Sequence, residues 1–165
     1  MTWQETLNFV KQIPYGRNAN RDDFSLIISE NKGTCSSKHA YLKDFANKNN
    51  IPNIKLIIGM YKMNEQNTKI GTILSQNKIE YIPEAHCYLK IDDKTVDITS
   101  KDADFEKIKA DLLLEIEIEP YQVADFKVDY HQNFIKNWLK ETNSNFTLEQ
   151  IWKIRECCIE KLILD

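Results

Sequence analysis

Apolar residues recur at helical spacing in several stretches of the chain. Trp3, Leu7 and Val10 form one stripe behind the capping residue Thr2, which predicts a helix through about Gln12. The same spacing predicts further helices over residues 22–30, 35–49, 128–140 and 147–164.

Other stretches have the character of strands, being rich in Ile and Leu or alternating apolar with polar residues. They cover residues 54–63, 85–91, 95–99 and 114–119. Asp92-Asp93-Lys94 separates the second from the third and predicts a hairpin turn. The polar residues 64–82 receive no assignment. Because no linker or repeat divides the 165 residues, we predict one α+β domain over 1–165.

A cysteine stands at the predicted start of the helix over residues 35–49. Gly33 and Thr34 precede Cys35, and the glycine frees the backbone to turn. In the first turn of a helix, the dipole and the unpaired backbone N–H groups favour thiolate over thiol. Cys35 is therefore a candidate nucleophile, and the alternative is a small buried hydrophobic residue.

The predicted hairpin brings an imidazole and a carboxylate to one face of the sheet. In strand alternation His86 points away from the face of Cys87, which we assign to the core. The apolar neighbours of Asp97 also take the core face. Asp97 then shares the face of His86, directly opposite it or one diagonal step away, where its carboxylate could hold an imidazole N–H.

These motifs resemble the core of the transglutaminase-like superfamily. Gly33-Thr34-Cys35 opens a helix, Glu84-Ala85-His86-Cys87-Tyr88-Leu89 follows, and Val96-Asp97-Ile98-Thr99 comes next. The resemblance covers residues 33–99, ahead of the predicted helices over 128–164. It implies a papain-like α+β fold in which the nucleophile helix packs on an antiparallel β-sheet. It also implies Cys35 as nucleophile, His86 as general acid/base, and Asp97 as the residue that orients His86.

The resemblance does not assign the second oxyanion donor, because the family takes it from a variable upstream position. Tyr15 and, behind it, Asn18 are candidates in the polar loop over residues 14–20. The same residues fit an ordinary turn, which we prefer. Tyr88 stands where many members of the superfamily carry Trp, and it is a further candidate for an oxyanion or substrate contact.

The resemblance implies a thiol-dependent acyl-transfer enzyme with no cofactor, acting on a protein, peptide or small amide through an acyl-enzyme. Water would make it a peptidase, amidase or deamidase, and an amine would make it a transamidating enzyme. We favour hydrolysis, because the chain has no acidic loop of EF-hand type and no room for the extra domains of full-length transglutaminases. The alternative is a non-catalytic transglutaminase-like module that binds a peptide.

A zinc site is a competing interpretation of four residues: Cys35, His39, His86 and Cys87. Adjacent strand residues face opposite ways, so residues 86 and 87 would not easily bind one ion, and we expect no metal. We expect His39 on the packed face of its helix or in a hydrogen bond near the site.

Residues of the last two predicted helices have less specific roles. We expect His131 to be a surface or cap residue, with replacement of His86 as the alternative. Cys158 falls on an apolar stripe and should be in the core, Cys157 has no assignment, and the helix over 147–164 could also form a homodimer surface.

Composition and charge limit the classes of partner that we expect. There are 22 basic and 25 acidic residues, the net charge is −3, and only Arg17, Arg21 and Arg155 could make bidentate phosphate contacts, so we expect no nucleic acid. Apolar runs are too short to cross a bilayer, and the N-terminus lacks the pattern of a secretory signal. We therefore expect a cytoplasmic protein without a membrane partner and with reduced cysteines.

Overall fold

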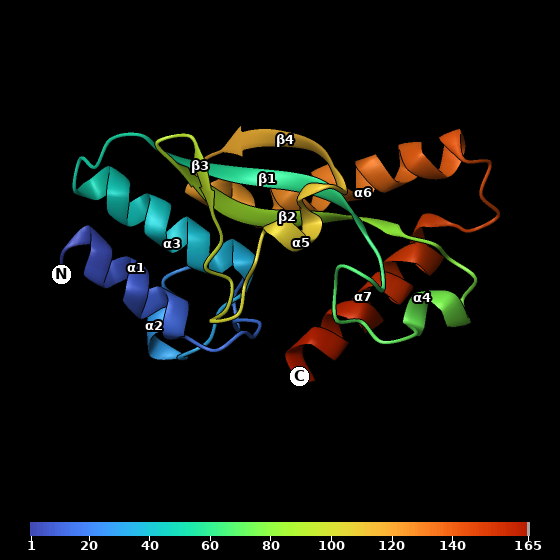
Figure 1. Ribbon diagram of the computed structural model, residues 1–165, viewed down its shortest axis with the longest axis horizontal. Coiled ribbons are helices and arrows are strands. Elements are labelled where there is room, and N and C mark those ends of the chain that lie inside the picture. The colour runs from blue at the N-terminus through green and yellow to red at the C-terminus, as the bar shows by residue number, and fades with distance from the viewer. Residues whose placement is uncertain (165) are drawn as a thin grey trace.

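The computed structural model describes residues 1–164, in which one antiparallel sheet of four strands is packed against helices (Figure 1). This confirms the predicted α+β class. In the spatial order β3-β2-β1-β4, the sheet contains β1 (Ile54–Met63), β2 (Ile82–Ile91), β3 (Lys94–Val96) and β4 (Leu112–Ile118). The helices are α1 (Trp3–Gln12), α2 (Leu26–Ser29), α3 (Cys35–Lys48), α4 (Ile73–Gln76), α5 (Glu106–Lys109), α6 (Asp125–Glu141) and α7 (Leu148–Leu164), with a 3₁₀ turn η1 (Pro120–Val123).

Helices pack at both ends of the sheet. α3 packs on β1 and β2, and α1 packs on α3, at the left of Figure 1. α6 packs against β2 and α7, and α7 lies with α4 at the other end of the sheet. Within residues 1–164, no helix combines the length and apolar character needed to cross a membrane.

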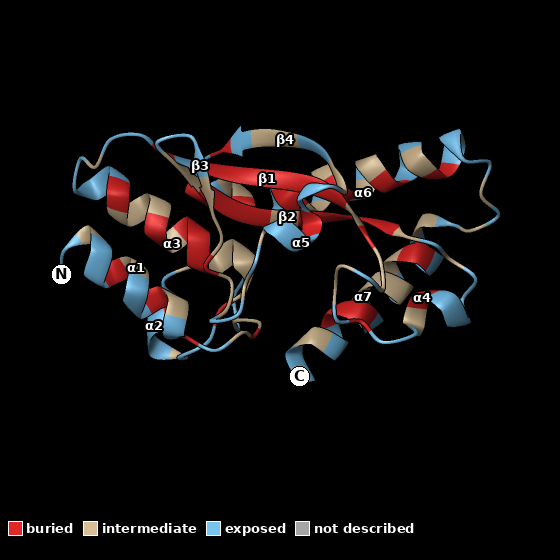
Figure 2. Cartoon of the chain, viewed as in Figure 1, coloured by how far each residue is buried: buried red, intermediate tan, exposed pale blue. Residues whose placement is uncertain are grey.

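Two apolar clusters form the interior, and the central strands run through both (Figure 2). The first cluster holds the buried faces of α1 and α3 together with Leu56 and Leu89. The second holds Met63 and Ile82, at the far ends of the same two strands, against α6 and α7. The strands thus pack against both helix groups, α1 with α3 and α6 with α7, and α6 links the two, because its Tyr130 and Phe134 also pack against the first cluster.

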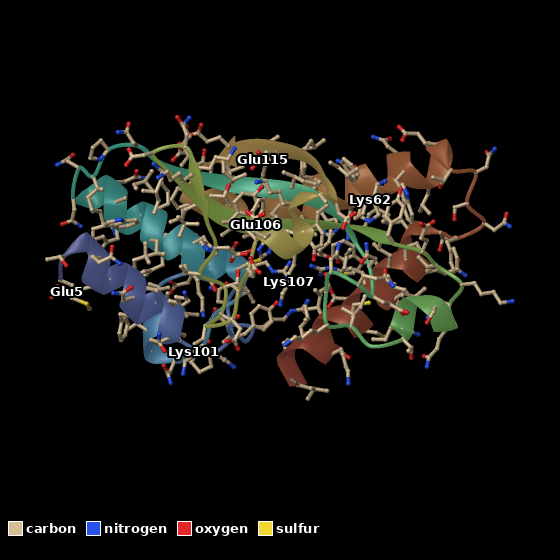
Figure 3. The ribbon with its side chains drawn as sticks, viewed as in Figure 1. Glu5, Lys62, Lys101, Glu106, Lys107 and Glu115 are labelled. Carbon is tan, nitrogen blue, oxygen red and sulfur yellow. The ribbon has the colours of Figure 1, made fainter. Side chains whose placement is uncertain are left out.

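Gly59 in β1 leaves the space that Tyr88 of β2 occupies. A Cβ atom at Gly59 would lie 2.3 Å from the Tyr88 hydroxyl oxygen. Because Gly59 has no side chain, Tyr88 reaches across β1 and donates its hydroxyl proton to Glu115 of β4, at 2.6 Å. Glu115 is labelled in Figure 3 and also accepts a hydrogen bond from Lys90 at 2.9 Å. Side-chain hydrogen bonds thus join β2 to β4 across β1, above Gly59.

Most predicted elements are present, with shifted ends. The helix behind Thr2 and the strand over 54–63 are confirmed, and the unassigned residues 64–82 contain the four-residue helix α4. β3 ends at Val96, three residues before the prediction. Asp97 there accepts hydrogen bonds from the backbone N–H of Thr99, at 3.0 Å, and from its hydroxyl, so the chain turns instead of continuing the ladder.

Candidate functional site

A cleft of about 280 Å³ lies where the two groups of helices meet over β2. One wall comes from the loop between α1 and α2, the first turn of α3, β2 and the segment after β3. The other wall comes from α6 and α7. Residues on the two walls include Tyr15, Cys35, His86 and Asp97 on the first side and Lys127 and Arg155 on the second.

Cys35 is the first residue of α3 and is partly exposed. Thr34 caps the helix, and its backbone N–H donates to the Ser37 hydroxyl at 2.9 Å. Gly33 needs no unusual backbone angle. It is required for space, because a Cβ atom there would lie 2.8 Å from a methyl carbon of Ile27. Tight packing beneath this turn therefore fixes the direction in which the cysteine enters the cleft.

His86 and Asp97 are in direct contact. The Nε2 atom of His86 lies 2.6 Å from Oδ2 of Asp97, and both side chains are largely buried. The Thr99 backbone N–H and hydroxyl hold the other carboxylate oxygen. Leu89 pairs with Val96 at the end of the β2–β3 ladder, so continuing that register would place Asp97 one diagonal step from His86.

The His86 ring also interacts with Cys35, so Cys35, His86 and Asp97 influence one another's pKa values. Burial lowers the pKa of His86, but the Asp97 carboxylate and the Cys35 thiolate outweigh burial and raise this pKa to about 10. Burial raises the pKa of Asp97, but the charge and the hydrogen bond of His86 hold it far below its ordinary value. With Nε2 bonded to Asp97, Nδ1 is left for the sulfur.

The Cys35 thiol is acidified by its neighbours. A hydrogen bond from the Cys87 thiol and the positive charges of Lys127 and His86 lower the pKa of Cys35, whereas burial raises it. Together they hold the pKa of Cys35 well below its ordinary value. Hydrogen bonding to Cys35, together with burial, raises the pKa of Cys87 well above its ordinary value. These shifts favour a thiolate at Cys35, a thiol at Cys87 and an imidazolium at His86.

Ser36 and Lys127 complete the surroundings of the sulfur, and sequence reasoning missed both. The Lys127 ammonium donates to the Ser36 hydroxyl at 2.7 Å and to the Cys35 sulfur at 3.9 Å. Ser36 in turn donates to the Cys87 sulfur at 3.7 Å. Cys87 is fully buried, as predicted, yet it also belongs to this network. No spacing in the sequence links residue 127 to residue 35, so Lys127 carried no local signal.

His39 and Lys38, on the buried side of α3, hold the backbone around the site. His39 Nδ1 donates to the Cys35 carbonyl at 2.7 Å, and its Nε2 accepts from the backbone N–H of Ile98 at 3.0 Å. Lys38 is fully buried and donates to the carbonyls of Ile13 and, at 2.8 Å, Thr99. Both nitrogens of His39 are therefore committed to backbone. Among residues 1–164, no group of three His, Cys, Asp or Glu side chains is placed to bind a metal ion.

The three further candidates lie in different places. Tyr15 lines the cleft beside Cys35, and a backbone bridge to Gly33 holds it there. Asn18 also lines the cleft, but its amide group donates to the Glu30 carboxylate at 2.9 Å and to the Lys32 carbonyl at 2.8 Å. The amide hydrogens of Asn18 are thus used within its own loop. Tyr88 is fully buried and turned toward β4.

His131 is buried, so the expectation of a surface or cap residue is wrong. It lies on the inner face of α6, donates from Nε2 to the Pro83 carbonyl at 2.8 Å, and packs edge-on against Trp152. Burial is the main reason that its pKa falls to about 4. It does not replace His86, because His86 lies 2.6 Å from Asp97, and the other histidine near that carboxylate is His39, at 3.8 Å. Cys158 is fully buried, as predicted, and Cys157 is exposed.

Ion pairs connect the far wall to the rest of the cleft. Arg155 of α7 donates to both carboxylate oxygens of Glu84 in β2, at 2.9 and 2.7 Å. Glu156 accepts from Arg17, in the loop between α1 and α2, at 2.7 Å. α7 is therefore bound both to the strand that carries His86 and to the loop that carries Tyr15.

Comparison with family models, with curated proteins and with solved structures finds no match to this chain. A function for this chain therefore rests on the geometry of the cleft.

Proposed function

We propose that the protein is a thiol-dependent acyl-transfer enzyme with a Cys35-His86-Asp97 triad and a papain-like, transglutaminase-like fold. The observation that carries the proposal is the 2.6 Å contact between His86 and Asp97 beside an acidified Cys35. The packing of α3, with Cys35 at its start, on an antiparallel sheet supports the fold assignment.

Each member of the triad has one role in the proposed reaction. The Cys35 thiolate attacks the carbonyl carbon of an amide or peptide and forms a C–S bond, and the carbonyl electron pair moves to oxygen. When the carbonyl re-forms, the C–N bond breaks and His86 gives its proton to the leaving amine. Asp97 holds the ring and stabilises its charge throughout. Water then hydrolyses the acyl-enzyme, and an amine in its place would give transamidation.

The test compares the reactivity of Cys35 with that of Cys157. Iodoacetamide labelling at pH 7, located by mass spectrometry, should modify Cys35 about tenfold faster than exposed Cys157. A free thiol with a pKa of about 8.5 is mostly protonated at that pH. Cys35→Ala should also abolish the release of p-nitrophenolate from p-nitrophenyl acetate, whereas the matched variant Cys157→Ala should retain it.

Equal labelling of the two cysteines in the folded protein would contradict the proposed enzymatic function and favour the peptide-binding alternative. If the enzyme passes this test, a cysteine-directed probe compared between the parent chain and Cys35→Ala in a lysate would point to its substrate.

A further inference from the structure

The ammonium group of Lys127 reaches the reacting sulfur from α6. Its nitrogen lies 3.9 Å from Cys35 Sγ, and the residue is about nine-tenths buried. A buried charge is costly unless an opposite charge compensates for it. The question is therefore which group provides the counter-charge for Lys127.

The Cys35 thiolate is the principal counter-charge. Within residues 1–164, Lys127 forms no ion pair with a carboxylate, and Glu84 is bound in two-point contact by Arg155. Burial lowers the pKa of Lys127, but the Cys35 thiolate, ahead of other groups, raises it above the ordinary value. Lys127 therefore stays protonated and acts as a fixed positive charge, not as a base.

The proposed reaction moves this counter-charge. When Cys35 attacks a carbonyl, the negative charge leaves the sulfur for an oxygen two bonds away, and the thioether sulfur that remains is neutral. Lys127 would lose its counter-charge unless the new oxyanion accepted one of its N–H groups. An ammonium has three such groups, and Ser36 takes one of them.

We propose, on the basis of the acyl-transfer function above, that Lys127 is a catalytic residue that stabilises first the thiolate and then the oxyanion. The oxyanion would then accept one hydrogen bond from the backbone N–H of Cys35 and one from the Lys127 side chain. Asn18 is excluded from this role because its amide hydrogens bond to Glu30 and Lys32. A charged donor in a desolvated site stabilises a developing oxyanion more than it would in water.

Two reagents separate the two roles, because only one of them forms an oxyanion. Iodoacetamide alkylates the thiolate by displacement at a saturated carbon, whereas p-nitrophenyl acetate passes through a tetrahedral oxyanion. Rates with both reagents are measured against pH and taken to the plateau where Cys35 is fully ionised. The variants are Lys127→Met and, as a second neutral form, Lys127→Gln. Lys127→Arg retains the charge, and the matched control is Lys136→Met, an exposed lysine on the same helix.

Both neutral variants should shift the two pH profiles toward higher pH. At the plateau they should lower the acylation rate by about 100-fold while leaving alkylation within about threefold. Lys127→Arg and Lys136→Met should retain acylation within about tenfold. An equal change in both plateau rates, or none, would overturn the oxyanion role. If the parent chain is alkylated at Cys35 but never acylated there, the proposed function itself falls, and this role falls with it.

Discussion

The three histidines show how the same side chain acquires different charges from its surroundings. His86 is protonated because a carboxylate and a thiolate flank it. His131 and His39 are buried against backbone groups, and burial is the main reason that both of their pKa values fall. Only the histidine whose two nitrogens face negative groups can act as a proton donor at neutral pH.

Nuclear magnetic resonance of ¹⁵N-labelled rings should show this difference. At pH 7 we expect one imidazolium signal, from His86, which persists as the pH rises toward about 10. Asp97→Asn removes the negative charge that raises the pKa of His86, so this transition should move to lower pH, toward about 6.5. An unchanged transition in that variant would show that Asp97 does not set the charge of His86. Thr95→Val, two residues away, is the control.

Cys87 should set part of the acidity of Cys35. Cys87→Ala removes the donated S–H, so the rise of the alkylation rate of Cys35 with pH should begin at higher pH, and the rate at pH 6 should fall. Cys158→Ala, which removes another fully buried thiol, should leave the profile unchanged. Identical profiles for the parent chain and Cys87→Ala would rule out the contribution of Cys87.

The predictability of these residues depended on local context. Cys35 and His86 could be proposed because a helix start and a strand face are visible in sequence. Lys127 and Ser36 could not, because their function depends on a contact between segments about 90 residues apart. A lysine on a helix resembles any solvated lysine until its surroundings are known.

At the scale of elements, single residues decide where strands end and how closely they approach. β3 ends because Asp97 bonds to Thr99 instead of to β2. The bounds of β1 were predictable because its apolar run is long, but the end of β3 was not, since Val96-Asp97-Ile98 alternates like any strand. The side-chain turn overrode the pattern and placed Asp97 beside His86.

Gly59→Ala should destabilise the sheet. The new methyl group would overlap the ring of Tyr88, whose hydroxyl is bonded to Glu115 on the far side of β1. Overpacking of this kind costs about 1–3 kcal/mol in the free energy of unfolding, measured by urea denaturation. Gly16→Ala should cost less, because the atoms nearest to its new methyl group are side-chain carbons of Lys32, at 3.2–3.7 Å. Equal effects of the two substitutions would contradict the proposed clash.

Arg155→Met should weaken the attachment of α7. It leaves the buried carboxylate of Glu84 without its two-point partner, and breaking a buried pair from one side costs about 3–5 kcal/mol. The double variant Glu84→Met with Arg155→Met removes both charges and should recover part of this loss. If the double variant unfolds at lower urea concentration than Arg155→Met, the unpaired carboxylate is not the cause.

At the scale of the whole molecule, one sheet supports two groups of helices, and the cleft lies at their boundary. The α+β class was predictable from the alternation of helical and strand patterns. The cleft was not, because α6 and α7 contain no motif that shows which side of the sheet they cover. Arg155 and Lys127 enter the cleft only through that placement.

The contacts that build the site join distant parts of the chain: Arg17 to Glu156, Glu84 to Arg155, and Ser36 to Lys127. Contacts of such long sequence separation form late in folding, since loop closure must come first. During refolding from urea, far-UV circular dichroism should therefore recover before the rapid alkylation of Cys35, measured by pulsed labelling. Simultaneous recovery would contradict this order. On this basis Cys35 becomes an activated nucleophile only after Cys87 and Lys127 have reached it, so a chain synthesised no further than α3 carries an unactivated cysteine.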